Sequence, residues 1–225
     1  MYSKLKMEKK DDVGGLRMNI SDMILAIPAL MISLAFHEYA HAKAADWQGD
    51  PTPRRAGRLT LNPISHIDPI GLVVFWLFRF GWAKPVPVNP FLFRNRRYGD
   101  VIVSIAGPAT NFILAFIAVF IFRSGIAAFN PALQTVFALL IIYNLSFGIF
   151  NLLPIPPLDG SHVLKGFLPE SLKSKYQQIE SFSMIILIVL LWTGIIGRIL
   201  GPAVYSVIDL FDSIAFSFFR LVGLF

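Results

Sequence analysis

The chain has 225 residues, of which 55% are hydrophobic and only 15% are charged, with a formal net charge of +6. A soluble domain carries about a quarter charged residues, so this composition excludes an ordinary soluble protein and indicates a membrane protein. The sequence has no cysteine, which excludes disulfides and thiolate metal sites. Basic residues lie mainly between apolar segments, so loops that orient membrane helices explain the positive charge better than nucleic-acid binding does.

Five segments approach or reach the length of about 20 mainly apolar residues that a membrane-crossing helix requires. They are Ile20–Ala45, Val101–Phe122, Leu133–Leu153, Phe182–Leu200 and Ala203–Phe225. The last is the weakest prediction, because it carries Asp209 and Asp212 and could lie partly at the membrane surface. We therefore expect an all-α polytopic membrane protein with about five transmembrane helices. Residues 1–19 would be an N-terminal extension without a fixed fold, 20–180 the membrane core, and 181–225 the C-terminal transmembrane helices.

The region Trp47–Gly99 is not a spanning helix. Arg58–Asn62 alternates like a short strand, and Lys84–Asn89 reads as an extended segment whose prolines confine it to a sheet edge. Between them, Pro69–Trp82 is apolar but too short to span, which favours a re-entrant or interfacial piece. The sequence thus predicts a small β element and a re-entrant segment at one face of the membrane.

The distribution of Lys and Arg predicts that this face is cytoplasmic. Eight basic residues lie in Trp47–Gly99 and three lysines lie in Pro154–Ser181, whereas the short connection Arg123–Pro131 should face outside. The basic residues before Ile20 predict a cytoplasmic N-terminus, whereas the alternation of the helices predicts an external one, so the sequence leaves the side of the N-terminus open.

One polar motif stands inside the first apolar segment: His37, Glu38 and His41. Residues four apart lie on the same face of a helix, so the two histidines can bind one Zn²⁺ while Glu38 serves as general base. The alternative is a helix end with two interfacial histidines and a surface glutamate. Because polar groups inside a membrane helix are costly and usually functional, the spacing favours a metal site.

Catalytic zinc usually has three protein ligands and one open position. The candidates for the third ligand are His66, Asp159 and His162, with Asp68 as a weaker one. Asp159 follows a proline-rich turn that could hold its carboxylate at a fixed point. It could equally cap the plausible short helix Gly160–Leu168, and spacing alone does not separate the two roles.

Three motifs in order resemble those of a known family. They are His37-Glu38-Tyr39-Ala40-His41, Gly107-Pro108-Ala109-Thr110-Asn111 and Asn151…Pro154…Pro156…Leu158-Asp159-Gly160. Together they resemble the site-2 protease family of intramembrane metalloproteases, over roughly residues 21–165. Many members also carry a PDZ domain or a C-terminal accessory domain, and this chain resembles the short branch without either.

The resemblance implies one zinc ion per chain, bound by His37, His41 and Asp159. It also implies supporting roles for Asn111 and Asn151 near the site, although Asn111 could simply serve close helix packing. The implied substrates are transmembrane segments of other proteins, cut in or near the bilayer. The protein would then be a multi-pass protein of a prokaryotic cell membrane, with its site towards the cytoplasm and with membrane proteins and lipid as partners.

Three other functions fit parts of this pattern. A membrane protease could instead cut soluble or misfolded proteins, and an inactive scaffold is disfavoured by the intact motif. A metal transporter or metal-binding protein could use the same His and Asp cluster. Glu38 argues against a transporter, as does the scarcity of other polar residues in Val101–Phe122 and Phe182–Leu200.

A membrane helix must be locally unwound before its peptide bond can be cut, and its freed backbone groups then need new partners. A strand edge can supply them. Two segments could form that edge, Gly57–Asn62 and Lys84–Asn89, and in the second Val86 and Val88 keep their N–H groups between prolines. We expect this segment to clamp the substrate, while His66 either lines the site or belongs to a turn held by Asn, Asp and Pro.

Overall fold

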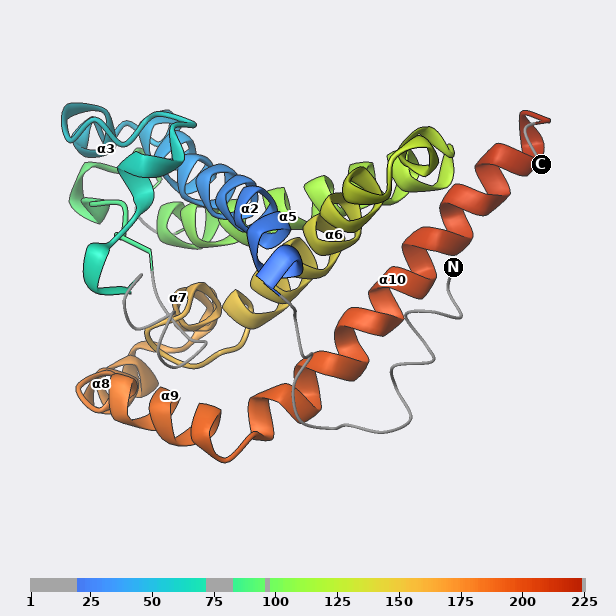
Figure 1. Cartoon of the computed structure of the whole chain (residues 1–225). Coiled ribbons are helices and arrows are strands. Elements are labelled where there is room, and N and C mark those ends of the chain that lie inside the picture. The colour runs from blue at the N-terminus through green and yellow to red at the C-terminus, as the bar shows by residue number, and fades with distance from the viewer. Residues whose placement is uncertain (1–19, 72–82, 96–97, 224–225) are drawn as a thin grey trace.

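The structure, a computed structural model, describes residues 20–71, 83–95 and 98–223, and this part of the chain is largely helical (Figure 1). The four long helices are α2 (Ile20–Trp47), α5 (Gly99–Arg123), α6 (Pro131–Asn151) and α10 (Ile195–Leu221). The shorter helices are α3 (Thr52–Arg55), α7 (Asp159–Phe167), α8 (Glu170–Glu180) and α9 (Ser183–Trp192). Three 3₁₀ turns are η1 (Pro63–His66), η2 (Pro90–Leu92) and η3 (Ile126–Phe129).

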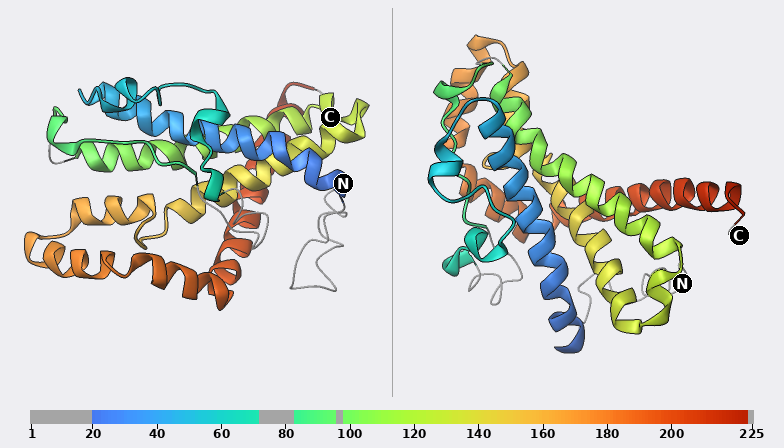
Figure 2. Two further views of the ribbon diagram at one scale, coloured as in Figure 1. Left: turned by 60° about the vertical axis from the view of Figure 1, so that its left-hand side comes forward. Right: turned by 90° about the horizontal axis from the view of Figure 1, so that it is seen from above.

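Helices α2, α5 and α6 form the core, and each of them packs against the other two. They run side by side in Figure 2, while α10 packs against α5 and α6 through a stretch that reaches from Val204 to Phe219, near its C-terminal end. The short helix α7 packs against α5. The beginning of α7 is thereby brought to the three-helix core.

Small residues fill the contacts between the core helices. The buried alanines are Ala26, Ala29, Ala35, Ala42, Ala44 and Ala45 on α2, with Ala115 and Ala118 on α5. Large apolar side chains such as Ile24 and Ile27 of α2 and Ile113 and Ile117 of α5 point outward instead. Membrane helices pack through small residues, because lipid accepts the large apolar side chains.

Four helices of the described residues are long and apolar enough to cross a membrane: α2, α5, α6 and α10. The prediction of a polytopic helical membrane protein is therefore confirmed, whereas the prediction of a spanning helix over Phe182–Leu200 is wrong. The chain bends at Gly194, whose φ of 70° lies in the left-handed region, and this ends α9 after ten residues. At 1.5 Å per residue α9 is about 15 Å long, half of what the bilayer core requires.

The segment after this bend, which includes the weakest predicted span, belongs to the 27-residue helix α10. Its Asp212 receives two hydrogen bonds from the guanidinium of Arg123 at the end of α5, at 2.5 and 2.6 Å. A charge inside a membrane helix is tolerated when it is paired in this way. The ion pair therefore explains how an acidic residue fits within α10, and it also ties α10 to α5.

The tight connection between α5 and α6 follows from its sequence. Gly125 adopts a φ of 81° after the last turn of α5. The side chain of Asn130 then caps α6 by accepting hydrogen bonds from the N–H groups of Ala132 and Leu133, and Pro131 occupies the first helical position. Asparagine followed by proline is a typical helix start.

The predicted β element does not form as strands among the described residues. Only an isolated antiparallel bridge pairs Ile67 with Ala83. Next to it, the N–H of Lys84 donates to the carbonyl of His66 at 2.9 Å. The ladder ends there because the prolines at 85 and 87 have no N–H groups. The predicted re-entrant piece, like the N-terminal extension, falls largely on residues outside the described ranges.

Candidate metal centre

The histidines and the glutamate of the first motif lie in the second half of α2 and are buried, with exposed fractions of 6% for His37, 8% for Glu38 and 8% for His41. The four-residue spacing places both imidazoles on one helix face, where their ring centroids are 4.6 Å apart. His37 lies ten positions before Trp47, where α2 ends. At 1.5 Å per residue the site is about 15 Å along the helix from that end.

Three ligand atoms from distant parts of the chain converge at this point. Nε2 of His37 is 3.0 Å from Nε2 of His41, and each of these nitrogens is 3.3 Å from Oδ2 of Asp159. Within the described residues, these three side chains form a group that could hold a metal ion. The structure thus brings Asp159 to the two histidines, as the resemblance implied.

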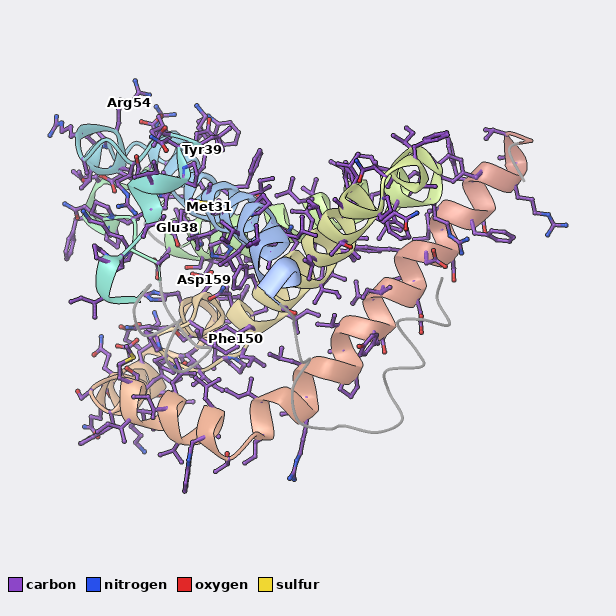
Figure 3. The ribbon with its side chains drawn as sticks, viewed as in Figure 1. Met31, Glu38, Tyr39, Arg54, Phe150 and Asp159 are labelled. Atoms are coloured by element: carbon purple, nitrogen blue, oxygen red, sulfur yellow. The ribbon has the colours of Figure 1, made fainter. Side chains whose placement is uncertain are left out.

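Asp159 reaches the site because it is the first residue of α7. The helix is preceded by Leu158 in an extended conformation, and no side chain caps its first turn. The alternative role of Asp159 as an N-cap is therefore not what the structure shows. Its Oδ2 atom is buried without a hydrogen-bond partner. Figure 3 shows Asp159 at the beginning of α7 and Glu38 on α2.

The second ring nitrogen of each histidine is held by an acceptor. Nδ1 of His41 is 2.8 Å from the carbonyl of Val103, which can only accept, so Nδ1 carries the proton. Nδ1 of His37 is 2.6 Å from Oδ1 of Asn111. The Asn111 amide is oriented by its Nδ2, which donates to the carbonyl of Ser33. In its neutral form, each histidine therefore presents an unprotonated Nε2 to the site.

This arrangement places three electron pairs against one another with no hydrogen between them, which is unfavourable unless a cation lies there. Zinc binds His nitrogens and carboxylate oxygens at about 2.0–2.2 Å in a tetrahedron, so its ligand atoms lie about 3.3 Å apart. The separations of 3.0, 3.3 and 3.3 Å among His37, His41 and Asp159 fit that geometry. The residues present are therefore suited to zinc.

Two glycines allow the close approach. A Cβ at Gly107 of α5 would lie 2.7 Å from Cε1 of both His37 and His41. A Cβ at Gly160 would collide with the carbonyl groups of Leu152 and Leu153, including a contact of 2.5 Å to the oxygen of Leu153. The first glycine lets α5 pack onto the histidines, and the second lets α7 start directly beside the end of α6.

The other candidate ligands lie elsewhere. His66 is fully buried, and its Nε2 is 2.8 Å from the carbonyl of Thr60, so it belongs to the turn. His162 pairs with Asp100, with Nδ1 3.1 Å from Oδ2. Asp68 accepts hydrogen bonds from the backbone N–H groups of the two residues after Pro69.

The predicted supporting residues differ in position. Asn111 contacts His37 directly. The Asn151 side chain donates to the carbonyl of Phe147 in its own helix at 3.1 Å. Val88 packs on the contact between α2 and α5, and Val86 is half-buried in the extended segment.

Sequence reasoning missed Ser33 and Asn144, which are fully buried and hydrogen-bonded to Asn111 and to each other. Their signal was present in the sequence, because both are polar residues inside apolar segments, where polar groups are costly and usually functional.

Comparison with known proteins agrees with this site. The model of peptidase family M50 matches residues 123–194. The chain is 40% identical over 206 residues to the candidate zinc metalloprotease YwhC of Bacillus subtilis, covering 87% of this chain and 94% of that protein. It is 33% identical over 196 residues to the candidate zinc metalloprotease Rip2 of Mycolicibacterium smegmatis, covering 83% of this chain and 73% of that protein.

The protein of the same name from Mycobacterium tuberculosis is 28% identical over 193 residues, covering 83% of this chain and 74% of that protein. No solved structure is significantly similar to the chain. The relatives are all named as metalloproteases and lend no support to the alternative of a metal transporter. The chain therefore belongs to peptidase family M50, the site-2 protease family, and is a zinc metalloprotease that crosses the membrane several times.

Proposed function

We propose that this protein cleaves peptide bonds in or near the transmembrane segments of other membrane proteins, with zinc held by His37, His41 and Asp159. The observation that carries the proposal is the convergence of their three ligand atoms at 3.0–3.3 Å in the interior of the bundle. Because α2 is a membrane-spanning helix, the bond to be cut has to come to that depth.

Glu38 is the proposed general base. Zinc, when bound, polarises the scissile carbonyl and lowers the pKa of a water molecule. Glu38 follows His37 directly on α2 and is 8% exposed, so its carboxyl is largely shielded from water. It would take a proton from the attacking water and return it to the leaving amine.

The two supporting asparagines would have different tasks. Asn111 has no N–H left for substrate, because Nδ2 donates to the carbonyl of Ser33 at 3.1 Å and to Oδ1 of Asn144 at 2.7 Å. Its role is therefore to orient His37. Asn151 keeps one N–H beyond its bond to Phe147 and is proposed to hold substrate or the developing oxyanion.

Substrate would be held by the extended segment Lys84–Asn89. The segment is anchored at both ends, since Lys84 donates to the carbonyl of His66 and Asn89 donates to the buried carboxylate of Asp50 at 2.6 Å. Arg58 also donates to the carbonyl of Lys84.

Between these anchors, the N–H groups of Val86 and Val88 have no hydrogen-bond partner within the described residues. An unwound substrate could pair with them by β-augmentation. Substrates with Gly or Pro near the cut should be favoured, because their helices unwind more easily. The basic residues of the 47–99 region support a cytoplasmic position for this face of the protein.

Metal content and cleavage test the proposal together. Wild type and the variants His37→Ala, His41→Ala, Asp159→Ala and Glu38→Gln are purified in detergent, analysed for zinc, and placed in liposomes with candidate single-pass membrane proteins. The three ligand variants should lose zinc and activity. Glu38→Gln should keep zinc and lose activity, because Glu38 is a base and not a ligand.

Three results would contradict the proposal. Full zinc occupancy in Asp159→Ala would remove Asp159 from the ligand set. Cleavage of membrane substrates by Glu38→Gln at the wild-type rate would remove Glu38 from the chemistry. A wild-type enzyme that cuts only soluble unfolded proteins in the same liposomes would favour the rival protease function.

A further inference from the structure

A chain of hydrogen bonds runs from the metal centre through the three core helices. Nδ1 of His37 on α2 is 2.6 Å from Oδ1 of Asn111 on α5. Nδ2 of Asn111 donates to Oδ1 of Asn144 on α6 at 2.7 Å, and Nδ2 of Asn144 donates to Oγ of Ser33, back on α2, at 2.8 Å. The side chains of Asn111, Asn144 and Ser33 are fully buried. The chain therefore forms a closed circuit across the bundle, shielded from water.

Backbone carbonyls fix the direction of every bond in this circuit. The hydroxyl of Ser33 donates to the carbonyl of Ala29 at 2.8 Å, which leaves its oxygen to accept from Asn144. Nδ2 of Asn144 also donates to the carbonyl of Leu140 at 2.8 Å. A carbonyl can only accept. Neither amide could turn over without placing its oxygen against a carbonyl oxygen.

The fixed direction of these hydrogen bonds also determines which nitrogen of His37 carries the proton. With its amide held by Asn144, Asn111 can present only its oxygen to His37. Nδ1 of His37 must then carry the proton, and Nε2 must carry the lone pair that faces His41 and Asp159. A metal-binding histidine needs this tautomer, and the partner of its other nitrogen commonly sets it.

We propose that Ser33 and Asn144 are positioning residues for the metal site, acting through Asn111 to hold His37 in its metal-binding tautomer and orientation. The inference rests on the proposed role of His37 as a zinc ligand. It goes beyond that role by extending the site to two residues whose side-chain hydrogen bonds, among the described residues, go neither to the metal ligands nor to the general base. In a membrane core, buried amides placed only for packing would need no fixed direction, since any satisfied pairing would serve.

The test is zinc affinity measured on the metal-free protein in detergent, by competition with a chromophoric zinc chelator. Partners of metal-bound histidines contribute about 10- to 100-fold in affinity. Asn144→Leu removes one of the two acceptors of the Asn111 amide and should weaken zinc binding by about tenfold. Ser33→Ala keeps both acceptors of Asn111 and frees only the far end of Asn144, so it should weaken binding less, by about threefold.

A second readout separates positioning from packing. Cobalt in place of zinc has a visible spectrum that reports the geometry of its ligands, and both variants should alter it. Ser206→Ala is the matched control for Ser33→Ala, because Ser206 makes the same bond to the carbonyl four residues earlier, on α10. Thr135→Val removes a polar group from α6 away from the circuit. Both controls should bind zinc and cobalt as wild type does.

The outcomes are distinct. Wild-type zinc affinity and cobalt spectrum in both Asn144→Leu and Ser33→Ala, with only a lower Tm, would overturn the inference and leave the circuit as packing. If Asn144→Leu does not fold, the zinc affinity and cobalt spectrum of Ser33→Ala alone decide whether the circuit positions His37. His37→Ala is measured alongside: if it keeps zinc, the proposed ligand set fails, whereas if it loses zinc while the other two variants bind normally, only the positioning role fails.

Discussion

Gly107 on α5 lies directly against His41 on α2, so close that a Cβ at position 107 would overlap Nε2 of the imidazole. The same Cβ would lie 2.7 Å from Cε1 of His37. Both neighbours are rings whose other nitrogen is already hydrogen-bonded, to Val103 and Asn111 respectively. The rings cannot turn away without losing those bonds. The metal site therefore requires a glycine at position 107.

Gly107→Ala should therefore displace the imidazoles. We expect at least about tenfold weaker zinc binding, as for other disturbances next to metal ligands, and a matching loss of cleavage. Overpacking typically costs about 1–3 kcal/mol, so the protein should still fold. Gly197→Ala is the control, because a Cβ there meets nothing within 4 Å. Full zinc content and activity in Gly107→Ala would show that the rings have room to move.

Val86→Pro tests the substrate clamp. Proline removes the N–H that is proposed to pair with substrate, so cleavage should fall strongly while zinc content stays unchanged. Val86→Ala keeps that N–H and should cleave almost as wild type does. Val88→Pro should also lower cleavage, but Val88 packs against the buried cluster that contains Ala44, Phe93 and Val103, so a change in packing could contribute to the result. If both proline variants cleave at the wild-type rate, this segment does not hold the substrate.

Single cysteines test the orientation, and the chain has no native cysteine to confuse the result. Arg55→Cys, in the basic region after α2, should resist a membrane-impermeant thiol reagent in intact cells and react after lysis. Phe129→Cys, on an exposed position between α5 and α6, should react in intact cells. The reverse pattern would place the active-site side outside.

The pairing of His162 with Asp100, which joins α7 to the first turn of α5, should make stability depend on pH. The hydrogen bond to Asp100 raises the pKa of His162. A histidine whose pKa is raised in the folded state stabilises the fold, and this stabilisation is complete at a pH below its unfolded pKa of about 6.5. The stabilisation is lost as the pH rises through the folded pKa. Both side chains are over a third exposed, so the effect should not exceed about 1 kcal/mol.

Thermal unfolding of wild type and His162→Gln in detergent measures this contribution. The difference in Tm should be largest near pH 6 and should shrink as the pH rises. A difference that is the same from acidic to alkaline pH would mean that the charged pair contributes nothing to stability.

Local spacing was enough to predict the helix that carries the histidines. His37 and His41 are four residues apart, and any helix brings such residues onto one face. The membrane setting followed from composition in the same way, because a chain so poor in charge cannot cover a soluble core. The break at Gly194 was missed, because the apolar run continues through it and a single glycine within such a run is often tolerated.

The sequence by itself determined the membrane-embedded class, the HExxH helix and, through resemblance, the family. Spacing left four candidates for the third ligand and the resemblance pointed to Asp159, but only the tertiary structure shows how one of these side chains meets the histidines. Asp159 does so because α7 begins beside α6 and packs on α5, while His66, His162 and Asp68 are engaged elsewhere. The hydrogen-bonded circuit through Asn144 could also be identified only from the structure, because it joins side chains of three helices that are separated in the sequence. Spacing along a chain determines contacts within one helix, whereas contacts between helices depend on how their faces pack.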